Sequence, residues 1–422
     1  MTAPSSRRLR IAVIGQSYPP LHGGVAEHIA ELSAELARRG HRVTVVTGGR
    51  EVGRSGGPWG AAGPDNGRPL PRVRREGGVR VVRVGRTLRV PANGASACVA
   101  LGIPPLRRLG LLARGSYDVV HIHAPFEPTL PLAALMSIRD PIVATFHSAG
   151  DLHWALRVFR GALAPFARRI RARIAVSRAA EEFVAPLFGG RYTIIPNGID
   201  RIRFHPDPLP GGDGPLTLLS VGRLDPRKGI ETVLDALPGI REAVGRPVQY
   251  IVAGNGPRRR SLEQRARRIS VPVRFLGAVD RSTLPDLYRS AHLVVAPALR
   301  GESFGVVLLE SLASARPVVA SDLPGYRDVL GSGKGSRLYR AGSGDGLVEA
   351  VAWVSRRDRL EALSREAPEV AARYDWRRVA AEVEEVYGSV LEGRDLRGSP
   401  SPRCRTGGGS SSCTPPCAPA PR

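Results

Sequence analysis

Arg223 and Lys228 are two cationic side chains whose types and spacing suit the binding of phosphate. They follow the β-branched run 216–221 closely. In open α/β sheets ligands bind at the carboxyl ends of the strands, where two fixed cations would neutralise a diphosphate leaving group. A lone arginine carries little signal here, because the 62 basic residues include only two lysines. Lys228 is one of those lysines, and its place beside Gly229 favours a function over an ordinary surface charge.

Glu302 and Glu310 lie eight residues apart around a predicted junction between a loop and a helix. The free N–H groups at the start of such a helix would face an anion. Glu310 stands within the apolar run 306–313, where a carboxylate needs partners for its oxygens. The two hydroxyls of a ribose could supply them, and the structural alternative is a buried ion pair with an arginine. For Glu302 the alternative is a solvated loop residue.

A glycine pair, Gly23 and Gly24, follows the first predicted strand and comes just before the amphipathic segment 26–38. Glycines at the mouth of a helix let backbone N–H groups approach a phosphate at the positive end of the helix dipole. The spacing is not the dinucleotide fingerprint GxGxxG, which disfavours a nicotinamide enzyme. An ordinary turn is the alternative for this pair.

Histidines occur at the ends of two predicted strands. His147 closes the run 142–146 and is expected to face a cleft between domains, which makes it the better catalytic candidate. His121 and His123 alternate along another strand, so both point to the same side. A metal site would need a third ligand, which this spacing does not provide. We therefore expect no metal and a structural or cleft-lining role for that pair.

The strands that must position these residues are nearly continuous apolar runs, as is typical of parallel strands covered by helices on both faces. They are expected at 9–14, 42–47, 119–122, 142–146, 174–176 and 193–195 in the first half, and at 216–221, 248–253, 273–276, 293–296 and 317–320 in the second. Strands and helices alternate through both halves. The pattern predicts an α/β protein with two doubly wound, Rossmann-like domains facing each other across a cleft.

Stretches rich in proline and glycine mark the expected boundaries. The richest, 203–215, is the predicted linker. It separates a first domain at 10–205, which includes a mobile loop at 48–78, from a second domain at 206–372. A terminal helix at 373–393 is expected to cross back to the first domain. Disorder is expected at both ends, 1–9 and 394–422.

Composition places the chain among globular proteins. Its 422 residues are 42% hydrophobic and 24% charged, which fits two or three domains with large cores. No run approaches the roughly 18 apolar residues that span a bilayer. Three of the four cysteines fall in the Gly/Ser/Pro-rich tail, so neither a disulfide framework nor a metal-ligand set is indicated, and a cytoplasmic protein is expected. The formal charge of +24 is a weak clue because arginine is used throughout.

Together these motifs resemble the set found in retaining glycosyltransferases of family 4, which have the GT-B fold. The similarity covers most of 9–392. The matching motifs, in chain order, are His22-Gly23-Gly24, Phe146-His147-Ser148, Ile195-Pro196-Asn197-Gly198-Ile199-Asp200, Gly222-Arg223 with Lys228, and Glu302 through Glu310. Within the family the chain most resembles the actinobacterial phosphatidylinositol α-mannosyltransferases that use GDP-mannose, through 142–147, 301–305 and 318–323.

The resemblance implies how a nucleotide-sugar donor would bind. Gly24 would back the diphosphate, Arg223 and Lys228 would neutralise it as it leaves, and Glu310 would hold the ribose. Charge stabilisation of the diphosphate would then supply most of the catalysis. No cofactor beyond the nucleotide sugar, with GDP-mannose expected, is implied, and a divalent metal would be optional at most.

The resemblance also implies contacts with the transferred sugar. Glu302 would hold its hydroxyls and His147 would contact it near the reacting carbon. The backbone that helps Glu302 is that of Phe304, Gly305 and Val306. The family's front-face transfer, in which the donor phosphate accepts the acceptor's proton, fits this arrangement better than a pair of catalytic carboxylates does.

The acceptor side departs from the pattern of the lipid enzymes. Tyr18, Asn93 and Gly94 are the expected acceptor contacts. The phosphatidylinositol enzymes are expected to carry an aromatic residue just before this Asn-Gly pair and arginines several residues after it. This chain has Ala92 before it and the sequence Ala-Ser-Ala-Cys at 95–98.

Two features bear on a membrane surface. The stretch 154–173 combines large apolar residues with six arginines, which is typical either of an interfacial helix or of an amphipathic helix packed on the sheet. Arg107 and Arg108 add basic charge nearby in sequence. Peripheral association with the inner face of the plasma membrane is therefore a hypothesis, and the oligomeric state is left open.

The leading hypothesis is retaining transfer of a hexose to a phosphatidylinositol-type or other lipid-linked acceptor, with α-mannosyl from GDP-mannose as the favoured sugar and donor. The alternative within the family uses a UDP-sugar, glucose or N-acetylglucosamine, with a soluble inositol phosphate or another acceptor. A different class is a non-catalytic protein that binds polyanions or sugar nucleotides. Nucleic acid is disfavoured as a partner because only 5% of the residues are aromatic and the notable residues follow strands.

Overall fold

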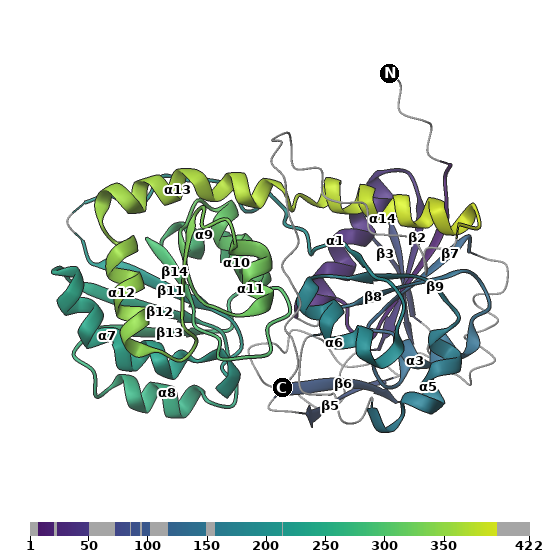
Figure 1. The fold of residues 1–422 in the computed structure, drawn as a ribbon, viewed down its shortest axis with the longest axis horizontal. Coiled ribbons are helices and arrows are strands. Elements are labelled where there is room, and N and C mark those ends of the chain that lie inside the picture. The colour runs from purple at the N-terminus through teal and green to yellow at the C-terminus, as the bar shows by residue number, and fades with distance from the viewer. Residues whose placement is uncertain are drawn as a thin grey trace, which may run out of the picture.

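The computed structural model describes residues 7–20, 23–49, 72–84, 86–92, 95–101, 117–148, 157–212 and 214–394. Two α/β domains lie side by side along the long axis of the molecule (Figure 1). Each is built on its own sheet, with helices packed over the strands. This arrangement confirms the predicted fold class of two Rossmann-like domains.

The first domain contains a sheet of eight strands in the order β10-β9-β8-β7-β1-β2-β4-β3. The strands are β1 Arg10–Gly15, β2 Arg42–Gly48, β3 Arg72–Glu76, β4 Val79–Val84, β7 Val119–His123, β8 Ile142–Phe146, β9 Ile170–Ala175 and β10 Thr193–Ile194. All neighbouring pairs are parallel except β3 with β4. The central strands β7 and β8 are buried along their whole length, as the continuous apolar runs predicted.

Two predictions for the first domain need correction. The expected loop at 48–78 contains β3, which pairs with β4, and a two-stranded hairpin of β5 Arg86–Ala92 and β6 Ala95–Leu101 follows. Leu9 was expected in a disordered start, but it is 6% exposed and packs in the core. Residues 1–6, 50–71 and 395–422 of the predicted mobile segments lie outside the described residues.

The helices of the first domain are α1 Gly24–Arg38, α3 Leu130–Ser137, α5 Arg160–Ala167 and α6 Arg178–Phe188. Helix α1 follows β1 directly and buries Ile29, Leu32 and Leu36, which are three or four residues apart and form one apolar face. Helix α6 begins at a capping residue, since the Ser177 hydroxyl accepts a hydrogen bond from the Ala180 N–H.

The second domain contains six parallel strands in the order β13-β12-β11-β14-β15-β16. They are β11 Leu216–Val221, β12 Val248–Ala253, β13 Val273–Gly277, β14 Leu293–Ala296, β15 Val318–Ser321 and β16 Ser336–Tyr339, of which β16 was not predicted. The helices are η1 Pro226–Lys228, α7 Ile230–Val244, α8 Arg259–Ala266, α9 Leu284–Arg289, α10 Val306–Ala313, α11 Pro324–Leu330, α12 Gly344–Val354 and α13 Arg357–Ala372.

The chain passes between the domains twice, and the two passages touch. The Ile199 N–H donates a hydrogen bond to the Tyr374 carbonyl at 2.8 Å, and Ile199 also forms a parallel bridge with Asp375. The Asp375 side chain then caps the last helix, α14 Trp376–Leu391. This helix, yellow in Figure 1, lies over the first domain and packs on α1 and β9.

Among the described residues, no helix is both long enough and apolar enough to cross a membrane.

Candidate active site

The segment after β11 carries the cationic residues in a fixed conformation. Asp225 caps η1 by accepting a hydrogen bond from the Arg227 N–H at 3.0 Å. Gly229 ends this turn with φ +64°, and a Cβ there would lie 2.1 Å from the Pro297 carbonyl oxygen. Only glycine fits both demands. The turn therefore sets Lys228 against the loop that follows β14.

Lys228 and Glu302, two predicted site residues far apart in sequence, form an ion pair. The Lys228 Nζ lies 2.7 Å from the Glu302 Oε1, with the two side chains 24% and 11% exposed. Arg223 is more exposed, and its Nε lies 3.8 Å from an oxygen of Asp225. The structure thus places both predicted cations beside carboxylates. A diphosphate would have to compete with these carboxylates for the two cations.

The starts of two helices from different domains face each other. Gly24 begins α1, and a Cβ built on it would lie 4.0 Å from the Cγ2 of Val306, which begins α10. Gly305 precedes α10 with φ +88°. Free N–H groups and the positive ends of two helix dipoles therefore converge on one region of the cleft. An anion between the domains would be stabilised by both.

Phe304 is another of the predicted donor-binding residues. Its side chain is 2% exposed and packs edge-on against Tyr374, so it belongs to the core. The sequence had assigned the backbone of this segment to the sugar, and the buried ring leaves the backbone as the part that can meet a ligand.

Glu310 has a partner that the sequence did not indicate. Its Oε2 accepts a hydrogen bond from the Tyr288 hydroxyl at 2.7 Å, and not from the arginine considered above as the structural alternative. Burial, together with the charge of Glu27, raises the pKa of Glu310 to about 7, against the opposing effects of the Tyr288 hydrogen bond and of Arg203 and Arg281. At neutral pH the neutral and the ionised form of this carboxyl group are therefore close in free energy.

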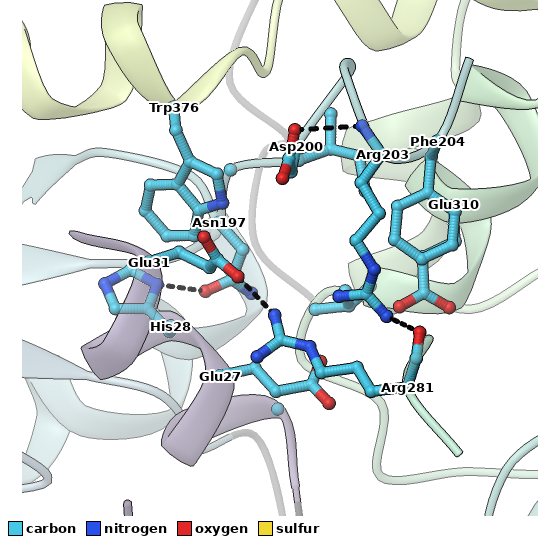
Figure 2. Close-up of a pocket in the computed structure, with 14 residues that line it drawn as sticks. Glu27, His28, Glu31, Asn197, Asp200, Arg203, Phe204, Arg281, Glu310 and Trp376 are labelled. Carbon is cyan, nitrogen blue, oxygen red and sulfur yellow. Dashed lines mark hydrogen bonds and ion pairs between the residues drawn. The ribbon is translucent and has the colours of Figure 1, made fainter. Parts of the chain in front are cut away.

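Glu310 lines a pocket between the domains, shown in Figure 2. Side chains from α1, from the passage 197–204 and from α10 meet there with Trp376 of α14. Arg281 forms an ion pair with Glu31 of α1, and Arg203 donates a hydrogen bond to the Arg281 carbonyl. A charged network thus ties α1 to the second domain across the cleft.

The Asn197-Gly198 pair, part of the resemblance, has a structural role in this pocket. Asn197 Oδ1 lies 2.8 Å from the His28 Nδ1. A Cβ at Gly198 would lie 2.4 Å from the Trp376 ring, so a side chain there would displace the tryptophan. The pair lets the passage between domains pack tightly under α14.

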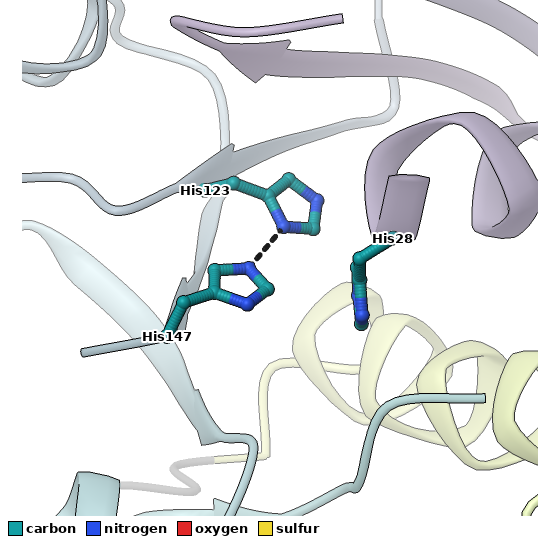
Figure 3. A group of neighbouring side chains, drawn as sticks. All are labelled: His28, His123 and His147. Carbon is teal, nitrogen blue, oxygen red and sulfur yellow. Dashed lines mark hydrogen bonds between the residues drawn. The ribbon is translucent and has the colours of Figure 1, made fainter. Parts of the chain in front are cut away.

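His147 directly follows β8 and is almost fully buried. It is 8% exposed and does not line the pocket, whereas His28, which packs edge-on against it, does. The His147 Nε2 lies 2.9 Å from the His123 Nδ1. Figure 3 shows that α1 supplies, through His28, the third imidazole that the spacing on the strand did not provide.

The acceptor candidates are only partly within the described residues. Tyr18 is 5% exposed, and the Arg83 guanidinium lies over its ring. Burial raises the pKa of Tyr18 to about 12, so its hydroxyl is neutral. Asn93 and Gly94 lie outside the described residues, as do Arg107 and Arg108.

Several residues of this cleft carried no usable signal in the sequence. Glu27 and Glu31 lie one helical turn apart on α1 and look like an ordinary solvated face. Arg203 and Arg281 are two of many arginines. Their roles depend on the approach of two domains, which a local pattern does not encode.

Two family models match consecutive parts of the chain. The model described as Glycosyltransferase Family 4 matches residues 22–203, and the model described as Glycosyl transferases group 1 matches residues 202–370. A phosphatidyl-myo-inositol mannosyltransferase from Mycolicibacterium smegmatis is 36% identical over 390 residues, which cover 90% of this chain and 94% of that protein. The chain belongs to glycosyltransferase family 4. It is a hexosyltransferase, as the resemblance implied.

Other relatives and solved structures agree with this assignment. A protein of the same name from Propionibacterium freudenreichii is 32% identical, covering 86% of this transferase and 91% of that protein. Sucrose-phosphate synthase from Thermosynechococcus elongatus has a TM-score of 0.69 at 20% identity and covers 92% of this chain and 100% of that one. Anabaena HepE in complex with UDP and glucose has a TM-score of 0.67 at 20% identity, covering 90% and 100%. The fold of this transferase is GT-B.

Proposed function

We propose that this transferase moves an α-mannosyl group from GDP-mannose to a phosphatidylinositol-type lipid, with retention of configuration. The observation that carries the proposal is 36% identity over 90% of the chain to a protein named phosphatidyl-myo-inositol mannosyltransferase. The cleft supports transfer from a nucleotide diphosphate, because helix starts and cations from the second domain converge there with the start of α1. In this proposal the first domain, 10–205, receives the acceptor and the second, 206–372, holds the donor.

The diphosphate lies between the starts of α1 and α10 in this mechanism. Gly24 lets the backbone approach it, and the dipoles of both helices favour its negative charge. Lys228 and Arg223 neutralise the charge that develops as the bond between the sugar C1 and the phosphate oxygen breaks. These side chains supply the positive charge, so a divalent metal is not required.

Transfer takes place on one face of the sugar. The acceptor hydroxyl oxygen bonds to C1 as the C1–O bond to phosphate breaks, the electron pair stays on the diphosphate, and a phosphate oxygen takes the hydroxyl proton. A double displacement would need two free carboxylates about 5–5.5 Å apart across the bond. Here Glu302 is paired with Lys228 and Glu310 with Tyr288, which supports binding roles for both glutamates. Glu302 holds the sugar, Glu310 the ribose, and His147 contacts the sugar.

To reach a lipid acceptor the enzyme must contact a membrane surface. The residues at the start of α5 suit such a contact. Val158 and Phe159 are 69% and 59% exposed and stand between Arg157 and Arg160. Exposed apolar side chains among arginines suit the headgroup region of an anionic bilayer. We therefore place the enzyme peripherally on the inner face of the plasma membrane.

The test is transfer of radiolabel from GDP-mannose to phosphatidylinositol in vesicles, with UDP-glucose and UDP-N-acetylglucosamine as competing donors and inositol phosphate as a soluble acceptor. Label in the lipid from GDP-mannose alone is the expected result, and it should persist in EDTA. The second candidate function is transfer from a UDP-sugar to a soluble acceptor. One observation favours it: Ala92 and 95–98 lack the aromatic residue and the arginines expected of the lipid enzymes. Label moving only from a UDP-sugar into inositol phosphate would establish that candidate and overturn the first.

A further inference from the structure

Four buried histidines lie together in the first domain: two on β7, one just after β8 and one on α1. The proposed reaction uses only one of them. His28, His121, His123 and His147, here called the histidine array, are each 8% exposed or less. Their hydrogen-bond partners among the described residues are neutral: Asn197, Tyr387, Thr145 and one another. Burial lowers the pKa of every member, to about 4 in His28 and about 3 in His121. All four imidazoles are therefore neutral at physiological pH.

The array could be a metal site or a hydrogen-bonded network. Ligand atoms of His28, His123 and His147 lie within 4.8 Å of one another, which suits a metal ion (Figure 3). A metal-bound histidine usually donates its other ring N–H to a carboxylate, a backbone carbonyl or water. Among the described residues no carboxylate bonds to any member of the array. The 2.9 Å contact between His123 and His147 is already a good hydrogen bond.

We propose that His123 is a positioning residue, which donates its Nδ1 hydrogen to the His147 Nε2 and so holds His147 in the tautomer protonated on Nδ1. The inference rests on the proposed function for the contact between His147 and the sugar. Its consequence is that His147 offers the sugar an N–H donor of fixed direction rather than a lone pair.

The direction of this hydrogen bond follows from an unpartnered nitrogen. The His123 Nε2 is buried and has no hydrogen-bond partner. If His147 were the donor, the His123 proton would lie on that Nε2, leaving a buried N–H without an acceptor. With His123 as the donor, its Nε2 carries only a lone pair. A buried lone pair without a donor costs less free energy than a buried N–H without an acceptor. His147 then carries its proton on Nδ1, which has no partner among the described residues and is open to a ligand.

The rest of the array fixes the ring of His123. It stacks on His121 with ring centroids 4.3 Å apart. His121 is held at both nitrogens, since Nδ1 lies 2.7 Å from the Tyr387 hydroxyl and Nε2 lies 2.6 Å from the Thr145 hydroxyl. Tyr387 belongs to α14, so the helix formed after the second passage between domains supports the orientation of His147.

The first experiment compares two variants of His123 in the full-length protein. His123→Phe keeps a ring for stacking but removes the hydrogen bond, and it should lower kcat about 10- to 100-fold with little change in the donor KM. His123→Asn places an amide N–H near the former Nδ1 and should recover most of kcat. The matched control is His292→Phe, a buried histidine of the second domain whose Nδ1 accepts a hydrogen bond from the Thr217 N–H. Equal kcat losses for the two phenylalanine variants would overturn the proposal.

The second experiment reads the tautomer directly, without activity. Nitrogen-15 NMR of the imidazole side chains, with His147→Gln for assignment, should show His147 neutral and protonated on Nδ1, and a mixture of tautomers in His123→Phe. Protonation on Nε2 in the wild-type protein would refute the assigned direction. If His147→Gln retained full transfer while the tautomer was as stated, the proposed sugar contact would fail and the array would stand. One equivalent of zinc in the purified protein, lost in His123→Phe, would replace the network by a metal site.

Discussion

The ion pair between Lys228 and Glu302 gives a quantitative test of leaving-group stabilisation. Replacing Lys228 by methionine keeps the length of the side chain and removes the charge. Loss of one group that stabilises transition-state charge lowers kcat by about 100- to 1,000-fold, or about 2.7–4 kcal/mol. The variant also leaves Glu302, whose side chain is 11% exposed, without its 2.7 Å partner. That should reduce the free energy of unfolding by about 1–3 kcal/mol.

Lys334, the second lysine of the chain, provides a matched control. It pairs with Glu369 at 3.1 Å, but the two side chains are 46% and 65% exposed. Such a surface pair contributes about 0–1 kcal/mol, so Lys334→Met should leave kcat unchanged and stability nearly so. The double variant Lys228→Met with Glu302→Gln removes the unpaired charge and should recover stability but not kcat.

The assay is single-turnover transfer from the nucleotide sugar at saturating enzyme, alongside urea denaturation of each variant. A kcat loss below about tenfold in Lys228→Met would refute the assignment of Lys228 to the leaving diphosphate, because that role demands at least the low end of the range given above. Recovery of kcat in the double variant would show instead that misfolding caused the loss.

Three further predictions concern pH, the membrane and the start of α10. Burial raises the pKa of Glu310 from 4.5 to about 7, so the folded protein binds this proton more tightly; the free energy of unfolding should fall by about 3 kcal/mol as pH rises through this interval, and denaturation of Glu310→Gln should lack that part of the slope. Phe159→Ser should weaken sedimentation with anionic vesicles about tenfold, whereas Ile202→Ser, which alters a 78% exposed side chain elsewhere, should not. Gly305→Ala puts a Cβ 2.6 Å from a tyrosine ring at φ +88° and should lower the unfolding free energy by about 1–3 kcal/mol, whereas Gly344→Ala, with open space around it, should not.

The buried strands could be predicted from sequence because a strand covered on both faces consists of consecutive apolar residues. β8, β11, β12 and β14 begin and end where the runs indicated. β3 shows why others were missed. Its sequence Arg-Val-Arg-Arg-Glu has no apolar run, since it lies at the edge of the sheet and is held by backbone pairing with β4. Edge strands often carry charged residues, which discourage pairing with other chains. A charged sequence of this kind is easily taken for a loop.

The sequence offered candidate site residues but not their contacts. Lys228, Glu302 and Glu310 were chosen because they stand at strand ends or helix starts, where this kind of fold places ligands. Their partners depend on distances across the chain. Tyr288 of α9 reaches Glu310, and His28 of α1 reaches the strand histidines, only after helices have packed on the sheets.

The donor-binding side chains already have protein partners, and this shapes how the cleft would bind its donor. Lys228 would exchange the Glu302 carboxylate for phosphate, and Glu310 would exchange a tyrosine hydroxyl, or a proton, for the ribose hydroxyls. Each new contact replaces one of similar kind, so the net gain is smaller than a count of donor contacts suggests. The facing starts of α1 and α10 differ, because their N–H groups meet an anion without giving up a side-chain cap. In the proposed mechanism, discrimination in favour of a diphosphate therefore arises chiefly from the two helix starts, and the charged side chains act most strongly when the leaving group takes up charge.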